Sequence, residues 1–148
     1  MRSRGKPMTT DAKRSGPRFA VLLVEPYSVV RATVKSVARS LNIVDVYESP
    51  SVETAVQMLH GRSFDGFVIA LGDDASGLDL INRIRSGDTS SPATAAVAIT
   101  TDRVDEKSIQ AFKQLDVRRV LLKPFKVKTI LETISAFAQP QDKATEPQ

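Results

Sequence analysis

The chain has 148 residues, of which 41% are hydrophobic and 26% charged, with a formal net charge of +4 at pH 7. This length and composition suit one globular domain with a sizeable core. The absence of cysteine excludes disulfides, thiol catalysis and cysteine metal sites. No apolar run has the length of a membrane span or the pattern of a signal peptide, so we expect a cytoplasmic protein that does not insert into membranes.

The positive charge is concentrated at the N-terminus. Residues 1–18 hold six basic side chains and one acidic side chain, whereas the remaining residues hold 15 basic and 16 acidic ones. We predict a disordered basic arm over 1–17, a folded domain over 18–138 and a flexible tail over 139–148; Met8 stays open as an alternative start. A basic arm can contact nucleic acid or acidic lipid, but a solvated leader is the favoured interpretation, and nucleic acid is disfavoured as a partner.

Between the two ends, strand and helix patterns alternate. The apolar run at 19–24 predicts a buried strand, and the helical spacing that follows predicts a helix over 28–41. A short strand follows at 43–47, and Ser51 is the expected N-cap of a helix to about residue 60. The run at 67–71 predicts a third strand, followed by a loop over 72–76.

The second half of the chain continues the same alternation. An amphipathic helix containing Leu78 stops at Gly87, and strand four is predicted at 95–100. A helix over 105–115, a strand over 117–122 and a final helix over 126–138 complete five strand–helix units. Asp102 and Arg103 are assigned to the start of the fourth helix, with no functional role.

Apolar strands separated by amphipathic helices indicate a parallel sheet covered on both faces. Five such units predict an α/β flavodoxin-like doubly wound (βα)5 fold with a five-stranded parallel sheet in the order 2-1-3-4-5. Ligands in this fold bind outside the carboxyl ends of the strands. The expected site therefore lies near residues 24–28, 70–76, 100–103 and 123–125.

The predicted edge carries Glu25 after strand one, Thr100 after strand four and Lys123-Pro124-Phe125 after strand five. These residues belong to the segments VLLVEPYSVVR, FDGFVIALGDDASGLDLINRIR, AITT and VLLKPF. In this order, over roughly residues 18–138, the segments resemble the receiver domain of bacterial response regulators of the chemotaxis-regulator type.

The resemblance implies a set of site residues. A working receiver has two adjacent acids that help to hold Mg²⁺, a phosphate-accepting aspartate after strand three, a hydroxyl after strand four and a lysine after strand five. Lys123, Thr100 and Glu25 match three of these positions. Pro26 stands where the second acid is expected, and Ala70 stands where the phosphoacceptor is expected.

Two further departures accompany these losses. The loop after Ala70 is about one residue short and lacks the usual proline, and Val120 replaces a common aromatic residue. The prediction is a degenerate pseudo-receiver without enzymatic activity or cofactor. In the alternative, Asp73 or Asp74 accepts phosphate with Mg²⁺; otherwise these residues form a solvated turn or cap the next helix.

The residues retained at the edge also have structural interpretations. We expect Glu25 and Lys123 to form a direct ion pair, which is favoured over residual metal binding at Glu25. The Thr100 hydroxyl has the alternative role of capping a loop. A flavin site is disfavoured, because Glu25-Pro26-Tyr27-Ser28 is not a phosphate-binding cradle.

With no further domain in the sequence, the expected output is a protein-binding surface. In receivers the fourth helix, fifth strand and fifth helix commonly meet partners or a second copy. Here this surface, the partner face, comprises Lys107, Gln110, Lys113, Arg118, Arg119, Val120, Thr129 and Glu132. Its mainly basic character favours an acidic signalling protein, such as a kinase or a regulator, as the partner. An ordinary charged exterior is an equal alternative. A homodimer stays open.

Overall fold

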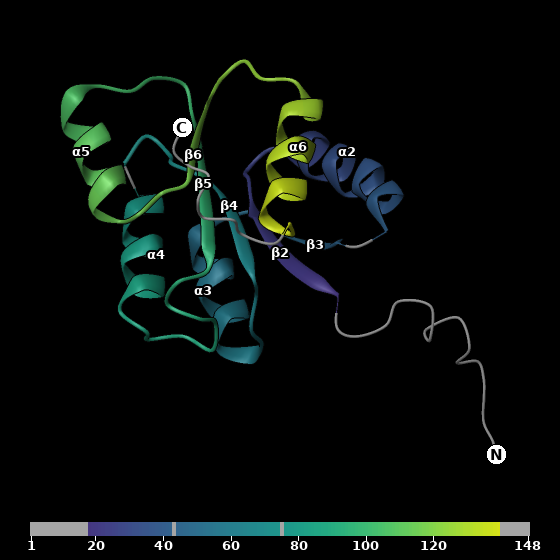
Figure 1. Cartoon of the computed structure of the whole chain (residues 1–148). Helices are drawn as coiled ribbons and strands as arrows, with labels where there is room; N and C mark the ends of the chain where they lie inside the picture. The colour runs from purple at the N-terminus through teal and green to yellow at the C-terminus, as the bar shows by residue number, and fades with distance from the viewer. Residues whose placement is uncertain (1–17, 43, 75, 140–148) are drawn as a thin grey trace.

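The computed structural model describes residues 18–42, 44–74 and 76–139 (Figure 1). The predicted arm and residues 140–148 of the predicted tail lie outside the described residues. The described strands are β2 (Phe19–Val24), β3 (Val44–Ser49), β4 (Gly66–Ala70), β5 (Ala96–Thr101) and β6 (Arg119–Leu122). The helices are α2 (Ser28–Ala38), the 3₁₀ helix η1 (Arg39–Leu41), α3 (Val52–Gly61), α4 (Ser76–Arg85), α5 (Glu106–Gln114) and α6 (Val127–Phe137).

The five strands form one parallel sheet in the order β3-β2-β4-β5-β6. Counted along the chain, this is the order 2-1-3-4-5, so the predicted flavodoxin-like fold is confirmed. The order reverses direction between β2 and β4, which is the position where this fold class places its ligand crevice.

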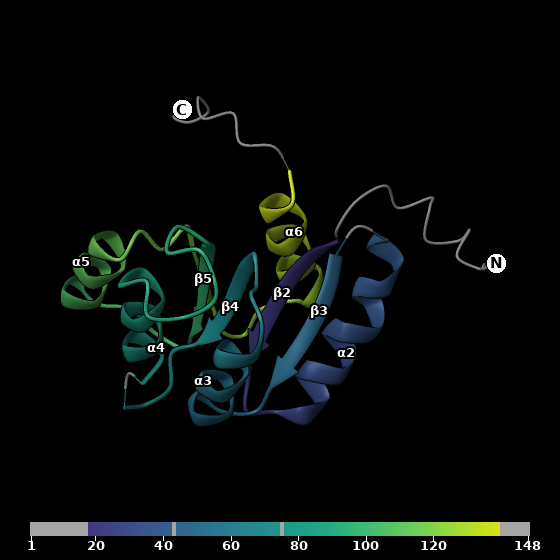
Figure 2. The ribbon, with the colours of Figure 1, turned by 90° about the horizontal axis from the view of Figure 1, so that it is seen from below.

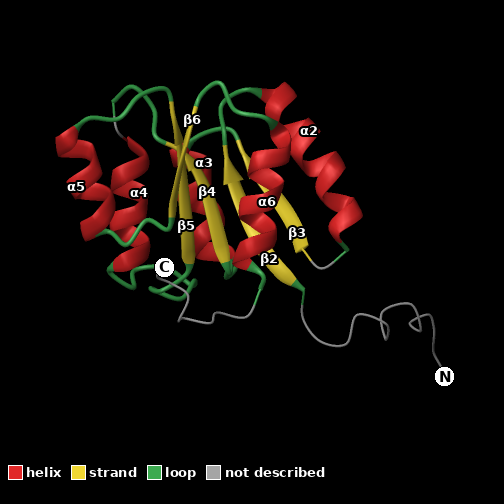
Figure 3. Ribbon diagram, turned by 45° about the horizontal axis from the view of Figure 1, so that its top comes forward, coloured by secondary structure: helices red, strands yellow, loops and turns green. Residues whose placement is uncertain are grey.

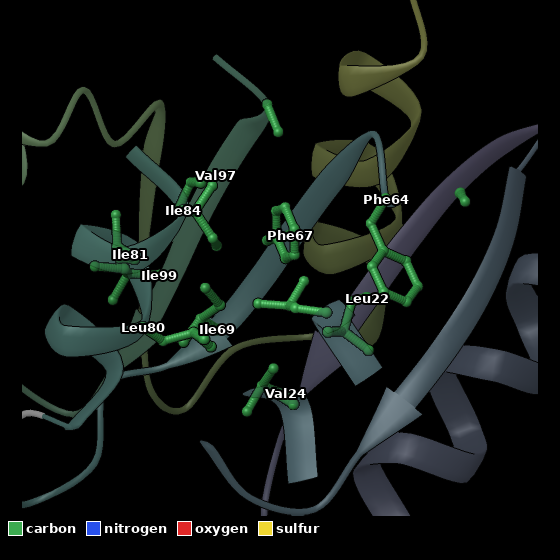
Figure 4. Close-up of a cluster of buried hydrophobic side chains, with 14 of the residues drawn as sticks. Leu22, Val24, Phe64, Phe67, Ile69, Leu80, Ile81, Ile84, Val97 and Ile99 are labelled. Atoms are coloured by element: carbon green, nitrogen blue, oxygen red, sulfur yellow. The ribbon is translucent and has the colours of Figure 1, made fainter. Parts of the chain in front are cut away.

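Helices cover the sheet on both faces (Figures 2 and 3). One core lies beneath α2 and α6 and contains Val21, Leu23, Val68, Ala98 and Leu121 from the strands. The other core lies beneath α3, α4 and α5 and contains Leu22, Phe67, Ile69 and Ile99 (Figure 4). Both strand faces are apolar because both are covered, which explains the continuous apolar runs in the sequence.

Several predicted boundaries are corrected by local backbone geometry. α2 ends at Ala38 and passes into η1, which Asn42 closes with a φ of 61°. β3 extends to Ser49, because its pairing with β2 continues through Val24. β6 begins at Arg119 rather than at 117, after Asp116 has adopted a φ of 56°.

Two helix starts depend on side-chain caps. The predicted N-cap at Ser51 is confirmed, since its Oγ accepts a hydrogen bond from the Thr54 N–H at 3.1 Å. Asp105 caps α5 in a capping box with Ser108, so this helix begins at Glu106. The assignment of Asp102 and Arg103 to the start of this helix is therefore wrong, and both lie in the loop after β5.

Candidate functional site

The alternation of side chains along the strands assembles the candidate site. Leu23, Val68, Ala98 and Leu121 belong to the core beneath α2 and α6. Two residues further along the same four strand paths stand Glu25, Ala70, Thr100 and Lys123. Because side chains two residues apart share a face, these four residues reach the same end of the sheet on the same side. The fold thus places the predicted pocket residues together, with Pro26 next to Glu25.

Ala70 ends β4 directly beside Thr100, its partner in the strand register. The Leu71 N–H donates to the Thr100 carbonyl at 2.9 Å, which fixes this pairing at the strand end. The backbone of Gly77 packs so closely that a Cβ there would stand 2.9 Å from the Ala70 carbonyl oxygen. The strand end is therefore firmly held, and its side chain is a methyl group that cannot attack a phosphoryl donor.

Glu25 is buried, with 2% of its surface exposed. Its Oε2 accepts a hydrogen bond from the Tyr27 N–H at 2.9 Å, so the carboxylate is turned onto its own loop. The Arg31 guanidinium holds the same loop from outside, because its Nη1 donates to the carbonyls of Glu25 and Pro26.

The predicted ion pair between Glu25 and Lys123 is wrong, since none joins these two described residues within 4.0 Å. The Glu25 carboxylate accepts a hydrogen bond from the Tyr27 N–H instead. The Lys123 Nζ lies 5.7 Å from the centre of the Tyr27 ring, within the range of a cation–π contact.

Thr100 is also buried, with 2% of its surface exposed, and its Oγ1 has no hydrogen-bond partner among the described residues. The proposed capping role of this hydroxyl is therefore wrong. The neighbouring Thr101 holds the loop instead, because its Oγ1 donates to the Arg103 carbonyl at 3.0 Å. A buried hydroxyl without a partner is uncommon in folded proteins and marks a position where a ligand or a small rearrangement would supply one.

The two loop aspartates behave differently. The Oδ1 atom of Asp74 accepts a hydrogen bond from the Ser76 N–H at 3.1 Å, so Asp74 caps the start of α4 as the structural alternative predicted. Hydrogen bonds from the Ser76 backbone and side chain lower the pKa of Asp74 below its ordinary value. Asp73 is exposed. Gly72, with a φ of 83°, forms the turn that leads into this loop.

Two hollows flank the edge and share Tyr27, Asp102 and Lys123. The first, the acidic hollow, has a volume of about 400 Å³. It is lined by Val24, Pro26, Tyr27, Pro50, Ser51, Val52, Glu53, Ala70, Gly72, Asp73, Asp74, Ser76, Asp102 and Lys123. The second, the apolar hollow, has a volume of about 450 Å³ and is lined by Glu25, Tyr27, Val30, Asp102, Lys123, Pro124 and Phe125.

The sequence placed Tyr27, Asp102 and Phe125 within the ranges of the predicted edge without giving them a role, and it missed Val30 as a lining residue. Tyr27 and Phe125 stand two residues after Glu25 and Lys123. An aromatic residue at the same offset from each retained charge was a signal in the sequence. Asp102 gave no such signal, because its place depends on where α5 begins.

The carboxylates at this edge do not fit the magnesium site that the resemblance implies. Of the expected ligands, only Glu25 is present, and its Oε2 is engaged by the Tyr27 N–H. Within residues 18–42, 44–74 and 76–139, no three His, Cys, Asp or Glu side chains come together as a metal site.

The predicted partner face lies on both sides of the edge strand β6. Lys113 and Val120 line an apolar groove of about 350 Å³ together with Val104, Ile109, Phe112, Val117 and Leu122. The guanidinium of Arg118 lies 5.7 Å from the centre of the Phe137 ring in α6. Thr129 and Glu132 belong to α6, which covers the opposite sheet face from α5. Of the eight residues, Lys113 and Val120 line this groove, whereas Thr129 and Glu132 lie on the other side of the sheet.

None of the described helices combines the length and the apolar character that crossing a bilayer requires.

Known proteins match this architecture over most of the chain. The response regulator receiver domain family matches residues 21–135. Chemotaxis protein CheY-3 of Vibrio cholerae is 30% identical over 116 residues, which cover 77% of this chain and 87% of that protein. Chemotaxis protein CheY of Pseudomonas aeruginosa is 27% identical over 115 residues, which cover 77% of this chain and 91% of that protein.

Solved structures agree with the sequence matches. A response regulator receiver protein from Pseudomonas putida has a TM-score of 0.70 at 25% identity, covering 82% of this chain and 98% of that one. A response regulator from Thermotoga maritima shares the fold, with a TM-score of 0.65 at 23% identity and coverage of 82% and 98%. This chain belongs to the response regulator receiver domain family, the receiver module of two-component signalling.

Proposed function

We propose that this receiver is a pseudo-receiver, which binds another signalling protein without being phosphorylated. The observation that carries the proposal is Ala70, whose methyl group ends β4 beside Thr100, where the family resemblance expects the phosphate-accepting aspartate. Without a carboxylate at this position, no acyl phosphate can form there.

The surrounding residues support the same proposal. The Glu25 carboxylate accepts the Tyr27 N–H, and the Lys123 ammonium lies over the Tyr27 ring. Asp74 caps α4. Each of these charged groups has an interaction within the chain that requires neither a phosphoryl group nor a metal ion.

A phosphorylation assay tests the proposal. The full chain is incubated with acetyl phosphate and Mg²⁺, and its intact mass is measured; we expect no phosphoryl adduct. Chemotaxis protein CheY of Pseudomonas aeruginosa serves as a positive control for the reagents. A double variant, Pro26→Asp with Ala70→Asp, tests whether the two missing carboxylates restore labelling. Stoichiometric labelling of the unmodified chain would contradict the proposal.

A second candidate is a divergent receiver in which Asp73 accepts phosphate with Mg²⁺. It is favoured by one observation: Asp73 is exposed and lines the acidic hollow together with Lys123. In this case acetyl phosphate labels the unmodified chain, Asp73→Asn abolishes the label and Asp74→Asn keeps it. Loss of the label in Asp74→Asn instead would identify Asp74 as the acceptor. Asp74 is the weaker acceptor because it is engaged as a helix cap.

The partner proposed for this domain is an acidic signalling protein that docks an apolar side chain at β6. Ile109 and Leu122 in the groove are 41% and 50% exposed, and Lys113 supplies a positive charge beside them. Lys107, Arg118 and Arg119 add exposed basic groups around the groove. Like charges disfavour pairing of this face with a second copy and favour an acidic partner.

Pull-down from the native cell tests this face. The variant Lys113→Glu with Arg119→Glu should lose the partner, and the wild-type association should weaken as salt rises. A matched charge reversal far from β6, Lys35→Glu with Arg39→Glu on the α2 side, should retain it. If both variants recover the same proteins as the wild type, this face is not the docking site. Sedimentation of the isolated chain tests the homodimer separately.

A further inference from the structure

The apolar hollow combines two opposite charges with aromatic and aliphatic walls. Tyr27, Val30, Pro124 and Phe125 form the walls, and Glu25 and Lys123 contribute the charges. Its volume of about 450 Å³ falls within the range of small-molecule sites, roughly 300 to 1,000 Å³. Such sites are typically apolar with a few polar groups that orient the ligand.

Glu25 is a buried carboxylate without a cationic partner. It is 2% exposed, and no Lys, Arg or His side-chain nitrogen of the described residues lies within 4.0 Å of its carboxylate oxygens. The Tyr27 N–H, at 2.9 Å from Oε2, is the single hydrogen bond found for this carboxylate among those residues. A buried carboxylate is stabilised strongly by a positive charge, so a ligand ammonium at this position would supply what the chain does not.

Lys123, which lines the same hollow, has a positive charge without a carboxylate partner. No carboxylate of the described residues lies within 4.0 Å of its ammonium, which faces the Tyr27 ring. A ligand carboxylate would provide a charge-assisted hydrogen bond there. Because Glu25 and Lys123 line one hollow but do not meet, a molecule bearing both charges can contact both.

We infer that this hollow binds a zwitterionic small molecule of the amino-acid class with an apolar side chain. Its ammonium pairs with Glu25, its carboxylate pairs with Lys123, and its side chain packs against Tyr27, Val30 and Phe125. Asp102, which is exposed, adds a negative charge to the lining of the hollow. A side chain of a partner protein fits less well, because residues within a peptide chain have no free ammonium and carboxylate on one carbon.

This inference rests on the proposed function, since Glu25 and Lys123 are available to such a ligand only where no metal ion or phosphoryl group engages them. The ligand would make the domain a sensor of a small metabolite rather than of phosphate. Bound beside Pro124 and Phe125, it would contact the loop between β6 and α6, next to the partner face.

Calorimetric titration of the full chain tests the inference with defined ligands. L-phenylalanine and L-leucine should bind. Phenethylamine, 3-phenylpropionate and glycine, which lack the carboxylate, the ammonium and the side chain respectively, should each bind at least about tenfold more weakly. Absence of binding by both amino acids up to about 10 mM would overturn the inference. Phenethylamine binding as tightly as L-phenylalanine would also overturn it, because the site would then recognise a cation alone.

Variants assign the contacts. Glu25→Gln should weaken L-phenylalanine about tenfold or more and leave 3-phenylpropionate unchanged, whereas Lys123→Gln should weaken both. Glu53→Gln and Lys126→Gln, which change exposed charges outside the apolar hollow, should bind as the wild type does. Val30→Trp should abolish binding by filling the hollow. Circular dichroism checks the fold of each variant, and wild-type affinity in both Val30→Trp and Glu25→Gln would place the ligand elsewhere.

The phosphorylation assay separates this inference from the proposed function. No amino-acid binding together with no phosphoryl adduct would overturn the ligand and leave the pseudo-receiver in place. A phosphoryl adduct on the unmodified chain would contradict the pseudo-receiver itself, whatever the titration shows.

Discussion

The polar side chains at the two ends of the sheet differ in how completely they are hydrogen-bonded. At the amino end, polar side chains are paired with backbone groups. The Arg85 guanidinium donates to the carbonyls of Ala93, Ala95, Leu115 and Asp116. Asp65 accepts the Ala20 N–H at 2.8 Å, and the Ser91 hydroxyl accepts the Phe64 N–H at 2.9 Å.

At the carboxyl end, polar groups are paired less completely, and the Glu25 carboxylate accepts a single hydrogen bond among the described residues, from the Tyr27 N–H. The Thr100 hydroxyl is buried without a hydrogen bond among the described residues, and Glu25 and Lys123 do not pair with each other. The contrast teaches that the amino end is a structural clamp, whereas the carboxyl end keeps polar groups that a ligand or partner can satisfy. Unsatisfied groups lower stability, and the binding proposed above would explain why they are kept at one end.

The largest expected effect is that of Arg85→Met, which removes the hydrogen bonds between this guanidinium and four carbonyls at the amino end of the sheet. Burial lowers the pKa of the Arg85 guanidinium, because desolvation disfavours its charge, and the bonds to four carbonyls offset that cost. Methionine removes every donor, so we expect the free energy of unfolding to fall by about 3 kcal/mol in urea denaturation. Arg83→Met is the control, since Arg83 makes one exposed contact of 3.4 Å with Asp88 and should change stability by less than about 0.5 kcal/mol. Equal losses in the two variants would remove the distinction.

Gly77→Ala tests how firmly the carboxyl end of β4 is held. A Cβ at this position would stand 2.9 Å from the Ala70 carbonyl oxygen and 3.1 Å from the Leu71 Cα, both in the backbone. We expect a loss of about 2 kcal/mol in the free energy of unfolding, because the strand end or α4 must shift. Gly61→Ala is the matched control, since a Cβ there meets nothing within 4 Å. Its stability should be equal to or above that of the wild type, and a loss like that of Gly77→Ala would contradict the packing argument.

The same contrast explains how much the sequence could predict. Buried strands are visible as apolar runs such as residues 19–24, because covering both sheet faces leaves no polar positions. The placing of Ala70 beside Thr100 also follows from strand order alone. Side-chain partners do not follow from it: Glu25 bonds to the Tyr27 N–H instead of Lys123, because a backbone donor two residues away competes with a lysine from a distant strand.

The residue at which a helix begins is a second feature that the sequence does not predict reliably. Asp102 was assigned to a helix, but the capping box of Asp105 and Ser108 begins α5 later and leaves Asp102 at the edge of both hollows. Propensity alone does not choose between two nearby acidic residues as the N-cap. The choice depends on the Ser108 side chain, which bonds back to the Asp105 N–H at 3.0 Å.

Thr100→Val examines the unpaired hydroxyl with a nearly isosteric change. Removal of a buried hydroxyl without a partner should raise the free energy of unfolding by up to about 1 kcal/mol. Thr133→Val provides the contrast, because the fully buried Thr133 hydroxyl donates to the Thr129 carbonyl at 2.9 Å, and its loss should lower stability by about 1 kcal/mol. Destabilisation by Thr100→Val of the same size as by Thr133→Val would show that the Thr100 hydroxyl has a partner in solution.

The smallest expected effect concerns the acids that are paired at the carboxyl end. Hydrogen bonds from Ser108 lower the pKa of Asp105, and hydrogen bonds from Ser76 lower the pKa of Asp74, each from an ordinary value of 3.8. Because the folded pKa lies below the unfolded one, each carboxylate contributes stability that is fully present above the unfolded pKa. That contribution is lost as pH falls through the folded pKa.

We therefore expect the urea concentration at the unfolding midpoint of the wild type to decrease as the pH is lowered below about 4. Protonation of the Asp74 and Asp105 caps accounts for part of this decrease. Asp105→Asn keeps a capping oxygen but cannot be protonated in this range, so its midpoint should change less with pH than that of the wild type. Ser108→Ala removes one of the donors and should raise the pKa of Asp105 in an NMR titration of the carboxyl group. An unchanged titration in Ser108→Ala would mean that the Ser108 side chain does not lower the pKa of Asp105 and that the backbone N–H of residue 108 alone holds this carboxylate.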